Sequence, residues 1–207
     1  MIFLPIFISI ASSASHAPAP PKIEPPRAFD VKGVSPGVSF AEWLEKISDA
    51  KYKCVVLDES PGHTVKSCGM TGEPNCSMIG AKSFCLDEPK FDTFAGQQVV
   101  FEYKFHDDML WEIDIHGIIP NAFESVVSTM ETKYGKATVS KSDIQNRMGA
   151  HFEDESAIWT GANGIILYKK YSDKLDLPSK LTVYSSDGWK AIEATVQQNS
   201  ERAKNDM

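Results

Sequence analysis

Two neighbouring segments alternate between large apolar and polar side chains, and this pattern constrains the fold most. They are Gln97–His106 and Leu110–His116. A period of two residues predicts strands with one buried face. Because a one-residue slip would move every apolar side chain to the other face, burial also fixes the register. With Asp107–Met109 as a three-residue loop, the expected cross-strand pairs are Phe101–Ile115, Tyr103–Ile113, Phe105–Trp111 and, on the other face, Lys104–Glu112.

Helical patterns lie on both sides of this hairpin. Ser39 followed by Glu42 is a capping box and begins a first helix. A second helix is expected over 120–134, capped by Asn121 and ended by Gly135, and a third over 188–204, capped by Asp187. The chain is therefore expected to be α+β, with an antiparallel sheet and helices on one face. The predicted core includes three tryptophans, which are Trp43, Trp111 and Trp159.

A second hairpin signal is Asn163-Gly164, which separates two apolar segments. Centred on these two residues, the hairpin places Trp159 opposite Tyr168 and Gly161 opposite Ile166. A further strand is expected over 181–186.

The four cysteines are confined to a short part of the chain, at Cys54, Cys68, Cys76 and Cys85. In an oxidising compartment such a set predicts disulfides, for which three connectivities exist. A hairpin centred on Pro61 brings Cys54 opposite Cys68, which leaves Cys76 to pair with Cys85. No pair has the two-residue spacing of a zinc knuckle, so we expect no metal.

The N-terminus has the pattern of a secretory signal peptide: MIFLPIFISI is followed by small residues and then by prolines. We expect a periplasmic or secreted protein with a signal peptide over 1–17, in which cleavage after Ala14 suits the small residues best. A proline-rich, mobile leader is expected over 18–34. The remaining units are 35–96, a helix with the disulfide-bonded hairpin, and 97–207, which holds the other elements.

Composition limits the partners. The 207 residues carry a formal charge of −7, and Lys and Arg form no run. These features argue against nucleic acid or anionic lipid as the main partner. The apolar N-terminal stretch is too short for an integral membrane span. We expect no cofactor and a monomer.

The segments GVSPGVSFAEWLEKI and IIPNAFESVVSTMETKYGKA share a similar helix start, and each helix leads into antiparallel strands. This arrangement resembles the tandem helix-plus-sheet modules of small exported bacterial proteins, such as outer-membrane assembly lipoproteins and β-lactamase inhibitory proteins. The resemblance implies two diverged helix-plus-sheet units and contact with another protein rather than catalysis.

No nucleophile elbow, phosphate loop or HExxH motif is present. The expected register places Glu102, Asp114, His106 and His116 on the outward face of one hairpin. Carboxylates beside imidazoles can hold a divalent ion or exchange protons, so Glu102, Asp114 and His116 are the candidate residues of a metal-dependent or acid–base hydrolase. The alternative is the solvated face of an amphipathic sheet, on which a cation such as Lys104 would relieve the repulsion between Glu102 and Asp114.

The segment GMTGEPNCSMIG (residues 69–80) lies between cysteines and predicts a constrained loop. A loop held at both ends loses little entropy on binding, so Met70, Pro74 and Met78 are candidate contacts for a protein partner. The sequence thus favours a non-enzymatic binding module that uses this loop or a sheet edge. An inhibitor of a secreted enzyme is a narrower form of the same function.

Overall fold

The alternating segments form the centre of a large antiparallel sheet. A computed structural model describes residues 26–47, 51–72, 75–79, 82–86, 88–145, 148–171 and 179–205. In chain order the elements are α1 (Phe40–Lys46), β1 (Tyr52–Ser60), β2 (His63–Met70), β3 (Asn75–Ile79), β4 (Lys82–Leu86), β5 (Asp92–Phe94), β6 (Gln97–His106), β7 (Met109–Ile118), the 3-10 turn η1 (Pro120–Ala122), α2 (Phe123–Tyr134), β8 (Thr138–Gln145), β9 (His151–Gly161), β10 (Gly164–Lys169), β11 (Ser179–Ser185) and α3 (Ser186–Asn205). The α+β prediction is confirmed.

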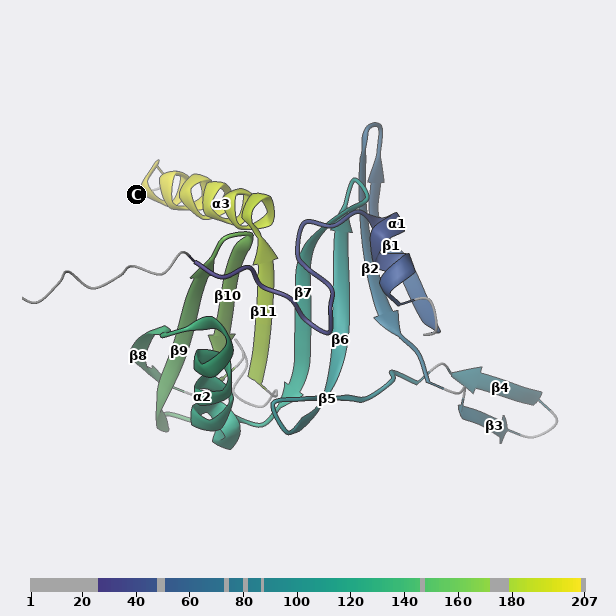
Figure 1. Ribbon diagram of the computed structural model, residues 1–207, viewed down its shortest axis with the longest axis horizontal. Coiled ribbons are helices and arrows are strands. Elements are labelled where there is room, and N and C mark those ends of the chain that lie inside the picture. Colours follow the sequence, from purple (N-terminus) through teal and green to yellow (C-terminus); the bar gives the residue numbers. More distant parts are fainter. Residues whose placement is uncertain are drawn as a thin grey trace, which may run out of the picture.

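Two four-stranded meanders make up most of the sheet (Figure 1). The strand order is β1-β2-β6-β7-β11-β10-β9-β8, and the short β5 pairs with β6 beside this path. Each meander follows a helix, α1 or α2, and the last strands of the two meanders, β7 and β11, pair antiparallel. The expected boundary after residue 96 falls inside the first meander, because β2 pairs with β6.

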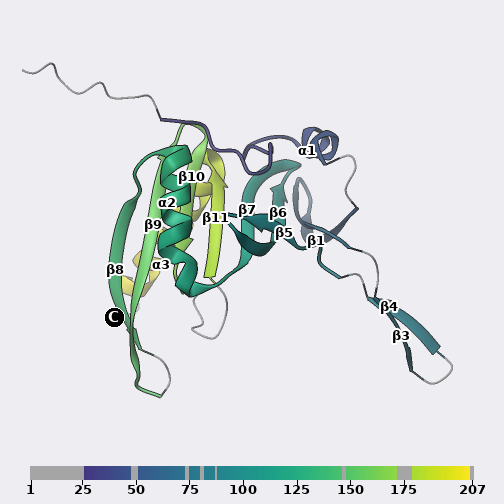
Figure 2. The same cartoon turned by 60° about the horizontal axis from the view of Figure 1, so that its bottom comes forward.

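The core lies between the sheet and the helices α1 and α2, which cover the same face (Figure 2). Trp43 of α1 is fully buried, and its ring centre lies 5.2 Å from those of both Tyr103 and Phe105. Phe123 of α2 stacks on Tyr168 at 4.8 Å. We call the opposite side of the sheet the outward face. The N-terminal part of α3 packs on that face, where Trp189 contacts Tyr184.

The β1–β2 hairpin has the predicted register from Tyr52 to Val56, and a bulge at Leu57 shifts the pairing by one residue beyond it. Cys54 lies opposite Cys68, and the two form a disulfide, so this prediction is confirmed. Cys76 and Cys85 lie opposite each other in the separate β3–β4 hairpin, which projects from the body in Figure 1. Their disulfide stays a prediction that this backbone register suits.

The β6–β7 hairpin has the predicted pairs over residues 100–104, but its end differs. Asp107 and Asp108 both have positive φ and form a two-residue turn, and a bulge after Lys104 pairs Phe105 with Leu110. The turn is one residue shorter than the expected loop, and the bulge takes up this extra residue. The pairs from Val100 to Lys104 therefore keep their predicted partners. The bulge also turns Trp111 to the outward face, so the prediction that Trp111 belongs to the core is wrong.

The turn between β9 and β10 lies at Ala162-Asn163, so Trp159 pairs with Ile166 and Gly161 with Gly164. The predicted register is therefore wrong by two residues. A two-residue shift keeps each side chain on its face, which is why Trp159 and Tyr168 are still buried.

Residues 26–34, the N-terminal segment, are packed rather than mobile, which corrects the end of the expected leader. Phe29, Val31 and Val34 are buried in the core. The side-chain oxygen of Asn163 accepts a hydrogen bond from the Phe29 amide at 2.7 Å, and its amide nitrogen donates to the Phe29 carbonyl at 2.9 Å. The expected signal peptide and the first part of the leader lie outside the described residues.

The helix starts agree with the sequence in one case of three. The Ser39 hydroxyl accepts a hydrogen bond from the Glu42 amide, as expected of a capping box. Asn121 does not cap α2, because it lies inside the 3-10 turn η1. Ser185 rather than Asp187 caps α3, since its hydroxyl accepts from the Gly188 amide at 3.0 Å.

Candidate functional site

The predicted hydrolase residues meet on the outward face, where rows of side chains cross the three adjacent strands β6, β7 and β11. The sheet register places Glu102 of β6 beside Asp114 of β7, and Asp114 beside Thr182 of β11. Neighbouring rows add charged side chains on both sides. The resulting group, which we call the ionic cluster, comprises Glu102, Lys104, Glu112, Asp114, His116 and Lys180.

Asp114 is the centre of the ionic cluster. Its side chain is fully buried, although it lies on the outward face. One carboxylate oxygen lies 2.7 Å from the ammonium nitrogens of both Lys104 and Lys180. The other accepts a hydrogen bond from the Thr182 hydroxyl at 2.7 Å. Both oxygens therefore have partners from the chain itself, which a buried carboxylate requires.

The two glutamates complete the ionic cluster on either side of Asp114. Glu112 lies 2.7 Å from the ammonium nitrogen of Lys104 and 3.3 Å from that of Lys180. Glu102 lies 3.1 Å from Nε2 of His116 and accepts a hydrogen bond of 2.5 Å from the Ser67 hydroxyl. Lys104 thus contacts Asp114 and Glu112, whereas the direct partners of Glu102 are His116 and Ser67 rather than the expected Lys104.

Burial and pairing act differently on the three acids. The hydrogen bond with His116 outweighs burial and lowers the pKa of Glu102 to about 2. Burial opposes ionisation of Asp114, but hydrogen bonds and the charges of Lys104 and Lys180 prevail and lower its pKa. Burial raises the pKa of Glu112, and the adjacent Asp114 adds to this effect. Glu112 is therefore the acid whose negative charge is least stabilised.

Glu102, Asp114 and His116 offer ligand atoms within 4.8 Å of one another, the spacing that a divalent ion would need. A metal would have to compete with Lys104 and Lys180, which hold the Asp114 oxygen that faces this group. The contacts that the structure describes therefore favour a structural network of opposite charges over a metal centre.

Strand β1 carries a second feature, which the sequence analysis did not single out. It forms one edge of the nine-stranded sheet, and within the described part of the chain no strand pairs with its outer side. Val55, Val56 and Leu57 are 55 %, 50 % and 57 % exposed. Three consecutive exposed apolar residues on an unpaired edge are uncommon, because such edges promote association with other chains.

The opposite edge of the sheet, β8, is protected in the usual way. Lys141 on β8 pairs with Glu153 at 2.7 Å, and Asp143 pairs with His151 at the same distance. Charged side chains of this kind discourage a further strand from adding to an edge. Strand β1 also carries charged residues, Lys53, Asp58 and Glu59, but residues 54–57 between them are uncharged, whereas the charges of β8 lie in the middle of that strand. The central part of β1 is therefore the more open of the two described edges.

The predicted binding loop has a different structure. Met70 is the last residue of β2 and packs against the core. Met78 belongs to strand β3, which pairs with β4. Pro74 lies outside the described residues. The segment is therefore divided between two hairpins, and Met70 is less available to a partner than its place between cysteines suggested.

Comparison with models of known protein families, with curated proteins and with solved structures gave no match. Among the described residues, no helix is both long and apolar enough to cross a membrane. The outward face and the β1 edge are therefore the features from which a function can be inferred.

Proposed function

We propose that this protein is an exported, non-enzymatic binding protein whose strand β1 pairs with an extended segment of another protein. The observation that carries the proposal is the uncharged, apolar outer edge formed by Val55, Val56 and Leu57. Backbone groups on an open edge supply hydrogen bonds to an added strand, and apolar side chains beside them supply burial.

The disulfide supports this role because it fixes the register of β1 against β2. Cys68 is fully buried and anchors the hairpin to the core. A rigid edge loses little conformational freedom when a partner binds, so more of the contact energy is retained as affinity. The disulfide and the signal-peptide pattern also support export to the periplasm or the medium.

The paired helix-plus-meander arrangement suits the expected resemblance to modular exported binding proteins. Inhibition of a secreted enzyme is one form of the proposed function. A hydrolase that uses Glu102, Asp114 and His116 is less well supported, because Lys104, Lys180 and Ser67 already hold the two carboxylates.

Site-specific crosslinking tests the proposal. A photoreactive phenylalanine analogue replaces Val55 in the full chain, and the purified protein is irradiated with an envelope extract of the source cell. We expect a discrete adduct whose partner peptide is identified by mass spectrometry. The purified partner should then slow hydrogen exchange of β1 amides, because strand addition gives them hydrogen-bond acceptors.

The matched control places the same analogue at Val139, which is exposed on the charged edge β8, and should give no adduct with that partner. Leu57→Lys should weaken binding of the purified partner, whereas Val139→Lys should not. The proposal is wrong if the partner leaves β1 amides unprotected, or if the adduct joins only two copies of this chain.

A further inference from the structure

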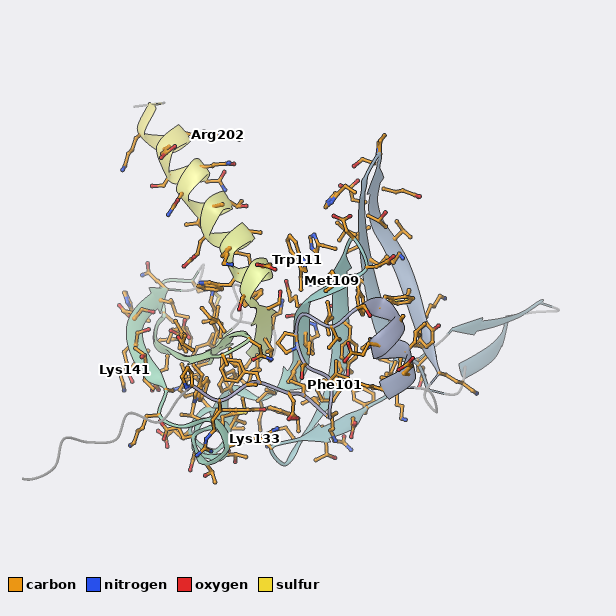
Figure 3. All side chains as sticks on the ribbon, turned by 45° about the horizontal axis from the view of Figure 1, so that its top comes forward. Phe101, Met109, Trp111, Lys133, Lys141 and Arg202 are labelled. Atoms are coloured by element: carbon orange, nitrogen blue, oxygen red, sulfur yellow. A yellow bond between two sulfur atoms is a disulfide. The ribbon has the colours of Figure 1, made fainter. Side chains whose placement is uncertain are left out.

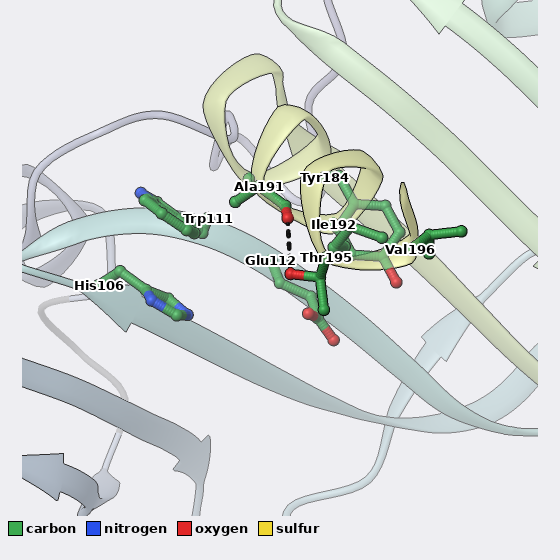
Figure 4. Close-up of a pocket in the computed structure, with 9 residues that line it drawn as sticks. His106, Trp111, Glu112, Tyr184, Ala191, Ile192, Thr195 and Val196 are labelled. Atoms are coloured by element: carbon green, nitrogen blue, oxygen red, sulfur yellow. Dashed lines mark hydrogen bonds between the residues drawn. The ribbon is translucent and has the colours of Figure 1, made fainter. Parts of the chain in front are cut away.

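A cavity of about 270 Å³ lies between α3 and the outward face of the sheet, next to the ionic cluster (Figure 4). One side is formed by Trp111 and His106, whose rings stack with their centres 4.1 Å apart. The other side comes from Tyr184 and the first turns of α3. The lining residues on α3 are Gly188, Ala191, Ile192, Thr195 and Val196.

Most of this lining is apolar or aromatic, but one charged group enters it. Glu112 lies between the Trp111–His106 pair and Tyr184 in Figure 4. Figure 3 shows the same region from outside: Trp111 lies at the base of α3, where the helix leaves the sheet. The cavity thus combines aromatic walls with a carboxylate, which is the combination that binds organic cations.

Charge in the neighbouring ionic cluster favours the same ligand. Glu112 and Asp114 share the ammonium groups of Lys104 and Lys180, while Glu102 pairs with His116. Both lysines contact Asp114, so Glu112 shares each of its cations with a fully buried acid. Lys180 lies 2.7 Å from Asp114 but 3.3 Å from Glu112, so an ammonium group beside Glu112 would strengthen its pairing, whereas an anion there would be repelled by the carboxylate.

We propose that this cavity binds a small organic amine. Its aromatic or branched aliphatic body lies between Trp111, Tyr184 and Ile192, and its ammonium group lies beside the Glu112 carboxylate. The volume of this half-open cavity suits a ligand of one ring with a short chain. This site is separate from the β1 edge, because β2 lies between β1 and β6, the nearest strand that lines the cavity.

Calorimetric titration of the full chain with three matched probes tests the charge requirement. Phenethylamine carries the ammonium group, 2-phenylethanol is its neutral counterpart, and phenylacetate is anionic. We expect phenethylamine to bind about tenfold more tightly than 2-phenylethanol, since an ion pair combined with an aromatic contact reaches this size in a partly desolvated site. Phenylacetate should show no saturable binding.

Two substitutions assign the site. Glu112→Gln should reduce phenethylamine affinity to that of 2-phenylethanol, while Glu193→Gln, at an exposed position of the same helix, should leave it unchanged. Ala191→Leu fills the cavity without altering charge and should abolish binding of both probes, with circular dichroism confirming the fold. Equal affinity for amine and alcohol overturns the proposal, as does binding that survives Ala191→Leu or an absence of saturable amine binding at millimolar concentration.

Discussion

The ammonium nitrogen of Lys104 lies 2.7 Å from a carboxylate oxygen of Asp114, whose side chain is fully buried. The two residues belong to paired strands but do not lie opposite each other, since Asp114 faces Glu102 and Lys104 faces Glu112. This diagonal contact allows one lysine to compensate two acids. The outward face is therefore a connected network, and its members should affect stability together.

Removal of Lys104 should destabilise the protein. Lys104→Met leaves Asp114 buried with one ammonium partner fewer, and we expect a loss of about 2 kcal/mol in the free energy of unfolding. Urea unfolding followed by tryptophan fluorescence measures it. Lys190→Met is the control, because Lys190 and Asp187 form an exposed pair on α3 and such pairs contribute little. Equal effects of the two substitutions would contradict the role of Lys104.

Acid should weaken the fold through Glu102. Its pKa is about 2 in the folded protein against an ordinary value of 4.5. A lowered folded-state pKa gives stability that is present above the unfolded value and is lost as the pH falls towards 2. Glu102→Gln should reduce the stability difference between pH 6 and pH 2 by about 1 kcal/mol, allowing for solvent screening of a partly exposed side chain.

Urea midpoints across this pH range provide the measurement for Glu102→Gln. Glu124→Gln, at an exposed position of α2, is the matched control and should leave the pH dependence unchanged. An unaltered pH dependence in Glu102→Gln would show that the contact with His116 has no energetic weight.

Loss of the Cys54–Cys68 disulfide should also reduce stability. The double substitution Cys54→Ala/Cys68→Ala opens a loop with a sequence separation of 14 residues, and we expect a cost of about 3 kcal/mol. Differential scanning calorimetry should show a lower melting temperature. Using a substitution rather than a reductant leaves Cys76 and Cys85 unaffected. An unchanged melting temperature would mean that the core alone holds β1 in register.

Asn163 should control the attachment of the N-terminal segment. Asn163→Ala removes both hydrogen bonds to the Phe29 backbone, with an expected local cost of about 1–2 kcal/mol. Trypsin should then cleave after Arg27 faster than in the unchanged protein. Asn121→Ala replaces an exposed asparagine that caps no helix and should not alter the cleavage rate. Cleavage at equal rates would show that burial of Phe29 suffices to hold the segment.

Turn signals and apolar alternation in the sequence predicted the pairing of strands that are adjacent in the chain. The Cys54–Cys68 register and the Tyr103–Ile113 pair follow from turn position and burial, which the sequence displays directly. The alternating pattern did not predict the bulge before Phe105, because it placed Trp111 in the core, whereas Trp111 stacks on His106 on the outward face. The aspartates at the turn were the available signal.

Long-range contacts explain the other differences. Asn163 suggested an Asn-Gly turn, but its side chain binds the Phe29 backbone, from which it is separated by 134 residues. Lys180 joins the ionic cluster only because β11 pairs with β7. Neither contact could be predicted from the periodicity of the sequence, because each joins residues that are far apart in the chain. The exposed Val55–Leu57 edge was also hidden, because three adjacent apolar residues suggest burial unless the position of the strand in the sheet is known.

The pairing of β7 with β11 has a consequence for biosynthesis. Residues 109–118 must wait for residues 179–185 before their second hydrogen-bonding partner exists. Until synthesis has supplied this last strand, β7 has an unpaired edge in the middle of the sheet that can bind another chain. We therefore expect truncation before Ser179 to yield aggregates rather than a smaller native protein, as size-exclusion chromatography would show.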